Sequence, residues 1–410
     1  MNMANNLLKR IIMTDVNPDL QSDLNKIEKI ITRKLPDTLE KNAPPNFAEL
    51  YFDFRQEYER FKEFILFDKL IGKNIVALGG GFSSGKSSFL NSILGEDILP
   101  SDITPSTSVP AYLIHDEQVT VYGINTFESK INMQSEEVSL IAHGFGQDDE
   151  DGMEVTLGHL LRSLFISSPN QPFSHLALLD TPGYSKAETN NYSAKTDEKI
   201  ARTQLNSANF ILWFVSADNG TITNSDIEFL RSLNQAIPKL VIVNKADKLP
   251  PDELDEVVEK IRDILKTKGI NFADVLTYSS EEPEYYDRDK ILEYTGKWNN
   301  AVTQSRFAYN FKVLFTKCKE YYENQILERR KYISRINKSS AYSDHEFVLT
   351  FLDELRKTTV DEISSFKETE NILSEISLSF FEEISNISKK VGIDMPEPTE
   401  IDLIDDKMED

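Results

Sequence analysis

The chain has 410 residues, of which 40% are hydrophobic and 28% are charged, and its only cysteine is Cys318. Lys and Arg number 45 against 68 Asp and Glu, which gives a formal net charge of −23. This acidic balance argues against a protein that binds the phosphate backbone of a nucleic acid, and a single cysteine excludes an intrachain disulfide. We expect two or three globular domains, a cytoplasmic location, no signal peptide and no transmembrane segment.

Residues 1–72 are predicted to form an N-terminal helical segment. Apolar residues follow helical spacing from Leu20 to Leu35 and again from Phe47 to Leu70. Proline has no amide hydrogen to continue a helix, so Pro36 is expected to end the first of these helices.

From residue 73 onward, the sequence alternates between apolar strands and helices, as far as about residue 300. This alternation is typical of a parallel α/β sheet. Besides the strands that carry the motifs below, we expect one helix at 155–166. We also expect strands at 112–115, 119–122, 209–216 and 275–278.

A glycine-rich segment follows the first strand of this α/β region. Residues 80–88 read Gly-Gly-Phe-Ser-Ser-Gly-Lys-Ser-Ser and contain the phosphate-loop pattern G-x-x-x-x-G-K-[ST]. In such a loop, backbone amides and a helix N-terminus surround phosphate oxygens, while the lysine contacts the β- and γ-phosphates and the next hydroxyl ligates Mg²⁺. The predicted nucleotide-binding residues here are Gly80, Gly81, Phe82, Ser83, Ser84, Gly85, Lys86, Ser87 and Ser88.

A second motif, Asp180-Thr-Pro-Gly183, follows an apolar strand. After a phosphate loop, this arrangement places a carboxylate beside Mg²⁺ and a glycine amide near the γ-phosphate. Asp180 is therefore a predicted metal ligand together with Ser87, and Gly183 is a predicted catalytic residue.

A third motif, Asn244-Lys-Ala-Asp247, ends another apolar strand. Asp247 can accept hydrogen bonds from N1 and N2 of guanine, a pair of donors that adenine lacks. Lys245 would pack on the base and Asn244 would join the loops. A backbone contact to the guanine carbonyl is expected at Ser279 and Ser280.

Residues 301–393 are predicted to be helical and to pack with 1–72. Helices are expected near 305–337 and 344–392, with a break at Ser339–Ser343. From Phe366 to Val391 the apolar residues keep near-heptad spacing, which is typical of a coiled-coil seam. Residues 394–410 are acidic and are expected to form a flexible tail.

Together, these motifs resemble those of the dynamin superfamily in its short, bacterial-type form. The resemblance is carried by 80–88, by Leu99-Pro100 with Thr107 and Pro110, by 180–183 and by 244–247, and it covers roughly residues 47–300. It implies a GTPase domain over 73–300 with a mostly parallel sheet, flanked by helices that form a neck-like bundle. It also implies that Thr107 is the switch threonine that ligates Mg²⁺, and that Ser83 acts near the transition state with K⁺ or Na⁺. Phe82 departs from the glutamine of eukaryotic dynamins.

The resemblance implies hydrolysis of GTP to GDP, with Ser83, Lys86, Thr107 and Gly183 as catalytic residues. Two GTPase domains would pair, in a homodimer or with another dynamin-like chain, and so move the helical bundle at a membrane surface. The chain would then be a peripheral membrane protein. The alternatives are a cytosolic regulatory GTPase that acts on a protein partner, and a ribosome-assembly GTPase, which the acidic charge disfavours.

Overall fold

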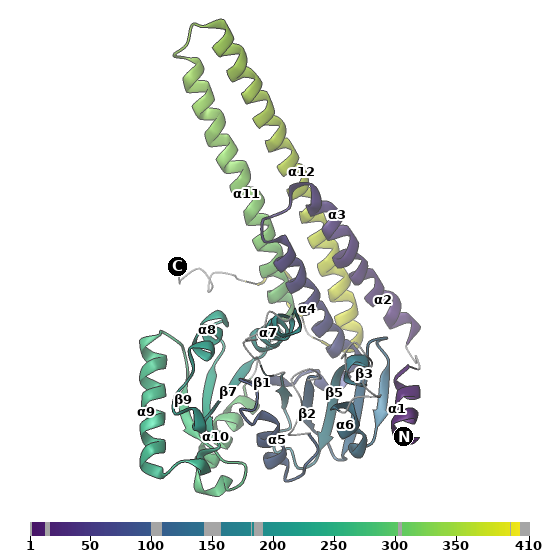
Figure 1. Cartoon of the computed structure of the whole chain (residues 1–410). Coiled ribbons are helices and arrows are strands. Elements are labelled where there is room, and N and C mark those ends of the chain that lie inside the picture. Colours follow the sequence, from purple (N-terminus) through teal and green to yellow (C-terminus); the bar gives the residue numbers. More distant parts are fainter. Residues whose placement is uncertain are drawn as a thin grey trace, which may run out of the picture. The chain divides into compact units, whose positions relative to one another are not determined.

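A computed structural model describes residues 2–12, 17–99, 109–142, 157–181, 183, 192–301, 306–393 and 395–401. The chain divides into two compact units (Figure 1). The α/β unit comprises Met1–Val16 and Leu66–Thr303, and the helical unit comprises Asn17–Ile65 and Gln304–Asp410. The N-terminal segment predicted over 1–72 is thus divided between the units, because its first helix belongs to the α/β unit.

The α/β unit is built on one sheet with the strand order β4-β3-β5-β2-β6-β1-β7-β8-β9. Its strands are β1 Asn74–Gly80, β2 Ala111–His115, β3 Thr120–Asn125, β4 Lys130–Met133, β5 Leu161–Ser168, β6 Leu176–Asp180, β7 Phe210–Ser216, β8 Lys239–Asn244 and β9 Asp274–Thr277. Strands β6, β1, β7, β8 and β9 run parallel, β2 is antiparallel to β6, and β3 is antiparallel to both β4 and β5. The predicted, mostly parallel sheet is confirmed.

The parallel strands are buried on both faces. Every residue of β1 and β8 is buried, which explains why these strands read as almost continuous apolar runs. The helices of this unit are α1 Asn2–Ile12, α5 Lys86–Leu94, α6 Ser135–Ala142, α7 Tyr192–Asn206, α8 Asn224–Ser232, α9 Pro251–Thr267 and α10 Arg288–Asn299. Because parallel strands end at the same edge of a sheet, the loops after β1, β6, β8 and β9 lie along one edge.

The helix predicted over 155–166 is wrong. A 3-10 turn at Leu157–Leu160 leads into strand β5, which pairs in parallel with β2 and antiparallel with β3. The apolar residues of this stretch satisfy helical spacing, but nearly all of β5 is buried. Pairing on both sides of the strand therefore decided its structure, as often happens for short apolar runs.

The helical unit combines a segment that follows the first helix of the chain with the C-terminal segment. Its main helices are α2 Pro18–Lys29, α3 Leu35–Leu39, α4 Phe47–Leu66, α11 Phe307–Ser340 and α12 Glu346–Val391. Pro36 does not end the first helix as predicted. A π-helical turn at Ile30–Lys34 lets the Leu35 amide reach the Ile30 carbonyl, and Pro36 then occupies the first turn of α3, where no amide hydrogen is needed.

Aromatic side chains join α4, α11 and α12. The ring centroids of Phe54 and Phe315 lie 4.8 Å apart, and those of Phe311 and Phe380 lie 4.7 Å apart. The Asn42 amide also donates to the hydroxyls of Ser365 and Thr369, both at 3.0 Å. Helices that precede and follow the sheet in the sequence thus form one bundle, which confirms the predicted fold class. None of the described helices is long and apolar enough to cross a membrane.

Candidate nucleotide site

The segment between β1 and α5 is a tight turn that only glycine can form at two positions. Gly80 and Gly85 have φ values of 139° and 85°, in the region that favours glycine. A Cβ on Gly80 would lie 2.4 Å from the Phe214 carbonyl oxygen, and one on Gly85 would lie 2.2 Å from Asn244 Nδ2. Ser83 also has a positive φ, 57°. The turn therefore brings backbone, rather than side chains, to the surface that faces a ligand.

Lys86 is the first residue of α5, and its ammonium group folds back over this turn. Lys86 Nζ donates to the carbonyl oxygens of Gly80 and Gly81, both at 3.3 Å. Burial lowers the pKa of Lys86, although the negative charges of Asp180 and Asp226 oppose this shift. A buried ammonium with carbonyl acceptors would gain stabilisation from an anionic ligand, as a phosphate provides.

Asp180 ends β6 directly beside the start of α5. The Ser87 hydroxyl donates to Asp180 Oδ2 at 2.7 Å, and Asp180 Oδ1 is buried without a hydrogen-bond partner among the described residues. Burial raises the pKa of Asp180, while Lys86 and Ser87 lower it. A carboxylate oxygen without a partner next to a hydroxyl is a donor set that suits a hard cation such as Mg²⁺.

Gly183 brings the segment after β6 close to the phosphate loop. A Cβ at this position would lie 2.9 Å from Phe82 Cα and 3.4 Å from Lys86 Nζ, so a larger residue would push the two segments apart. The Phe82 side chain itself is exposed. Thr107, the remaining predicted metal ligand and catalytic residue, lies outside the described residues. Pro182, which precedes Gly183 in the second motif, also lies outside them.

Asn244, at the end of β8, connects the phosphate loop to the third motif. Its Nδ2 donates to the carbonyl oxygens of Ser84 at 2.9 Å and Gly85 at 3.3 Å. Lys245 follows in the left-handed conformation, with φ 60°. Asp247 is exposed, and its Oδ1 accepts a hydrogen bond from the Ser279 hydroxyl at 2.5 Å. The aspartate is thus held by the loop after β9 and stays open to a ligand.

Sequence reasoning did not find the bond between Ser279 and Asp247, because each residue follows a different strand. Ser279 is fully buried, and its oxygen also accepts from the amides of Glu281 at 3.2 Å and Glu282 at 3.3 Å. Ser280, beside it, has a buried hydroxyl that lacks a partner in the described part of the chain. Ser279 and Ser280, the residues predicted to contact the guanine carbonyl, therefore lie in a loop that its own hydrogen bonds hold in place.

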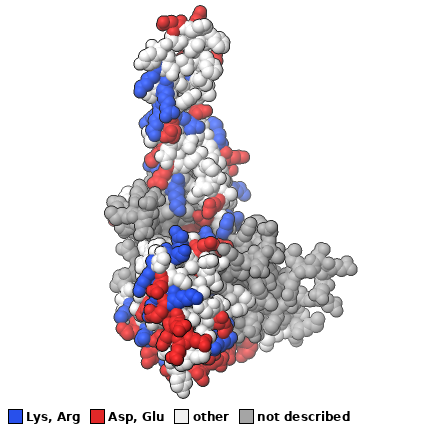
Figure 2. All heavy atoms as spheres, turned by 60° about the vertical axis from the view of Figure 1, so that its left-hand side comes forward, with Lys and Arg blue, Asp and Glu red and all other residues white. Residues whose placement is uncertain are grey.

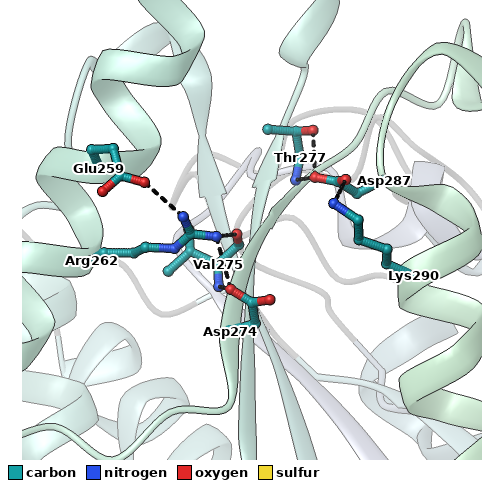
Figure 3. A network of polar contacts seen from close by, with 7 residues as sticks. All are labelled: Glu259, Arg262, Asp274, Val275, Thr277, Asp287 and Lys290. Carbon is teal, nitrogen blue, oxygen red and sulfur yellow. Dashed lines mark hydrogen bonds and ion pairs between the residues drawn. The ribbon is translucent and has the colours of Figure 1, made fainter.

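A polar network fixes the edge strand β9 that precedes this loop (Figure 3). Thr277 donates to Asp287 Oδ2 from both its amide and its hydroxyl, each at 3.0 Å, and Lys290 pairs with Asp287 Oδ1 at 2.7 Å. On the other side, Arg262 donates to Asp274 Oδ1 and to the Val275 carbonyl, both at 2.9 Å. Both ends of β9 are tied to the helices beside it, which keeps the position of Ser279 constant.

Three motif-bearing segments define a class of protein. The phosphate loop, Asp180 with Gly183, and Asn244 with Asp247 follow three strands of one mostly parallel sheet, which is the arrangement of a P-loop GTPase fold. Residues 76–246 also match the family model of the dynamin family. This match supports the predicted resemblance to the dynamin superfamily over that part of the chain.

Relatives with curated names are distant in sequence. Dynamin-like protein 2 of Campylobacter jejuni is 23% identical over 243 residues, which are 58% of this chain and 37% of that protein. Dynamin-like protein A of Bacillus subtilis is 24% identical over 215 residues, which are 52% of this chain and 16% of that protein. The matched parts thus span about a third of the first relative and about a sixth of the second. A solved structure of an oligomerised bacterial dynamin pair aligns with a TM-score of 0.47 at 18% identity and covers 87% of this chain and 53% of that one.

Proposed function

We propose that the protein binds GTP and GDP with Mg²⁺, and that it hydrolyses GTP. The observation that carries this proposal is the position of Asn244, whose amide ties the phosphate loop to the strand end that presents Asp247. A ligand that satisfies both ends must have a phosphate chain and a base with adjacent donors, which describes guanine nucleotides. The buried, unpartnered Asp180 Oδ1 beside Ser87 supports the metal.

In this proposal each residue has a separate task. Lys86 neutralises phosphate charge, Ser87 and Asp180 hold Mg²⁺ with Thr107, and the Gly183 amide approaches the γ-phosphate. Mg²⁺ supplies charge stabilisation for the transferred phosphoryl group. Ser83, which has a positive φ of 57°, is the residue proposed to act with a bound K⁺ or Na⁺. The assignments of Lys86, Ser87 and Asp180 are supported by their contacts, whereas those of Thr107 and Ser83 rest on the resemblance to the family.

The role of the helical unit is a second part of the proposal. Pairing of two GTPase domains, from the same chain or from another dynamin-like protein, would drive movement of the bundle. The work would take place in the cytoplasm, at a membrane surface. The distant bacterial dynamin pair provides a mechanism for the long-range sensing and tethering of membranes, and this property of that pair supports the membrane part of the proposal. The alternative is a cytosolic GTPase switch that acts on a protein partner.

Calorimetry with purified protein tests the nucleotide assignment. GTP and GDP should bind in the presence of Mg²⁺, ATP should bind much more weakly, and Lys86→Ala should abolish binding. Equal affinity for ATP and GTP would rule out the assignment.

Turnover per molecule, measured over about a hundredfold range of protein concentration in K⁺ and then in a large inert cation, tests pairing. We expect the rate to rise with concentration and to depend on the cation. A flat rate would exclude the homodimer. Recovery of activity on addition of a second dynamin-like chain would then identify a heteromer.

A further inference from the structure

The far end of the α11–α12 hairpin carries an apolar surface that no other helix of its unit covers. Tyr342 in the turn is 92% exposed, and Phe347 and Phe351 in the first turns of α12 are 76% and 53% exposed. Every residue from Asp344 to Phe351 is exposed, including Val348 and Leu349. We call residues 342–351 the tip. A helix start that is exposed on every side and has this apolar content indicates an interaction surface.

Behind the tip α12 carries charges of both signs, with Asp353 paired to Arg356 at 3.0 Å and to Lys357 at 2.8 Å, whereas the only charged side chains of α11 at that level are basic. Arg335 and Lys338 lie on α11, one helical turn apart and exposed, whereas Asp344 and Glu346 lie at the very end of the hairpin. None of these four side chains forms a salt bridge within the described part of the chain. Figure 2 shows the same order, with red atoms at the end of the hairpin, a largely white region behind them and blue side chains behind that.

The register of the hairpin places these groups along its axis. Arg329 on α11 pairs with Glu362 on α12 at 2.7 Å. Because the two helices are antiparallel, residues whose numbers sum to about 691, as 329 and 362 do, lie at the same level along the hairpin. Arg335 is therefore level with residue 356 and Lys338 with residue 353. Arg335 and Lys338 thus lie farther from the end of the hairpin than Phe351, and Asp344 and Glu346 lie nearer to that end than Phe347. The apolar residues are between them.

This order is self-complementary. If two hairpins overlap antiparallel by about two helical turns, roughly 10 Å, the acidic end of each meets the basic pair of the other. Phe347 and Phe351 of both copies then meet at the centre. Residues 327–362 contain seven Lys or Arg and seven Asp or Glu, so this segment is neutral in a chain of net charge −23. Contact through it avoids most of the repulsion between two acidic copies.

We propose that two copies of this chain associate tip to tip through their α11–α12 hairpins. An anionic lipid surface fits less well, because Asp344 and Glu346 would be the first groups to approach it. The association needs no nucleotide, so it is independent of the GTPase assignment and of any pairing of GTPase domains.

Sedimentation of the full chain without nucleotide tests the proposal. The wild type should show a concentration-dependent monomer–dimer equilibrium, which Lys86→Ala should leave unchanged. Phe347→Ser combined with Phe351→Ser should weaken association by at least about tenfold. Leu378→Ser is the matched control, because Leu378 lies on the same helix and is 72% exposed. A wild type that stays monomeric would overturn the proposal, as would an equal effect of the control.

Charge exchange distinguishes pairing from a general loss of structure. Arg335→Glu with Lys338→Glu should prevent association, and the further changes Asp344→Lys with Glu346→Lys should restore it. In a Cys318→Ser background, Leu349→Cys should form a disulfide between copies, whereas Leu378→Cys should not. If phosphatidylserine vesicles bind the chain through Phe347 and Phe351 while sedimentation is unaffected by these residues, the tip is a lipid site and the proposal is wrong.

Discussion

The side-chain amide of Asn244 lies so close to Gly85 that a Cβ at position 85 would be 2.2 Å from Nδ2. Asn244 donates to the carbonyl oxygens of Ser84 and Gly85, so this contact is part of a hydrogen-bonded joint. The end of β8 and the phosphate loop therefore behave as one rigid piece, and a change at either side should disturb both halves of the nucleotide site.

Gly85→Ala should lower guanine nucleotide affinity by roughly 5- to 150-fold, since a positive φ and a displaced Asn244 cost about 1–3 kcal/mol. Calorimetric titration with GDP measures this loss. Gly296→Ala is the control, because Gly296 lies in α10, has open space around it and has no positive φ. That change should leave affinity unaltered and stabilise the fold by up to about 1 kcal/mol. An equal loss of GDP affinity in both variants would contradict the role of the Asn244–Gly85 contact.

Asp247→Asn should exchange the base preference of the site. The amide of asparagine would face the N2 donor of guanine with a donor of its own, which costs a few kcal/mol. Xanthine has a carbonyl at that position, so xanthosine triphosphate should bind the variant better than GTP. Asp218→Asn removes a nearby surface charge, the partner of Lys248 at 3.1 Å, and should change neither affinity. Loss of both nucleotides from the Asp247 variant would mean that Asp247 does not face the base.

The metal dependence of nucleotide binding should vary with pH through Asp180. Burial raises the pKa of this carboxyl group, so in the free protein a proton competes with Mg²⁺ for it more strongly than for an exposed aspartate. The Mg²⁺ concentration needed for half-maximal nucleotide binding should therefore fall as pH rises above the range in which an exposed aspartate titrates. Asp180→Asn should raise that concentration and remove its pH dependence. An unchanged pH profile in the variant would exclude Asp180 as the titrating ligand.

The helical unit should lose stability as pH rises, because of Glu57. Burial raises the pKa of Glu57 to about 7, against the charge of Arg60 and a hydrogen bond from Asn310 Nδ2 at 2.9 Å. The folded state therefore holds a proton that the unfolded chain releases above about pH 4.5. Between about pH 4.5 and about pH 7 the free energy of unfolding should fall, by up to about 3 kcal/mol. Urea unfolding of Glu57→Gln should lack this fall, whereas Glu368→Gln, an exposed change on α12, should retain it.

The strands that carry the motifs could be predicted because they are fully buried, and a continuous apolar run that stops at glycine or a polar turn has few other structures. The four long helical pieces could be predicted for the same reason, from their apolar spacing. Strand β5 could not, because Leu157, Leu160, Leu161 and Leu164 fit a helix equally well. Pairing with β2 and β3, which are distant in the sequence, makes this segment a strand and not a helix.

The site shows the same limit. Motif spacing identified the residues that lie along the sheet edge, but not the contacts between loops. The bond from Ser279 to Asp247 depends on where β9 ends, and that end is set by Asp287, which holds Thr277. No local pattern around either residue signals this dependence. Such contacts arise from the packing of one strand on its neighbour.

The aromatic contact between α4 and α11 has a consequence for synthesis of the chain. Phe54 and Phe315, which touch in the finished bundle, are 261 positions apart in the sequence. At translation rates of about 5–20 residues per second, α4 leaves the ribosome roughly 13–50 s before its partner exists. During that interval the remainder of the α/β unit is made and that unit can fold, while the apolar face of α4 stays exposed. A trigger-factor-type chaperone that shields this helix should therefore increase the yield of the protein more than it increases the yield of the α/β unit.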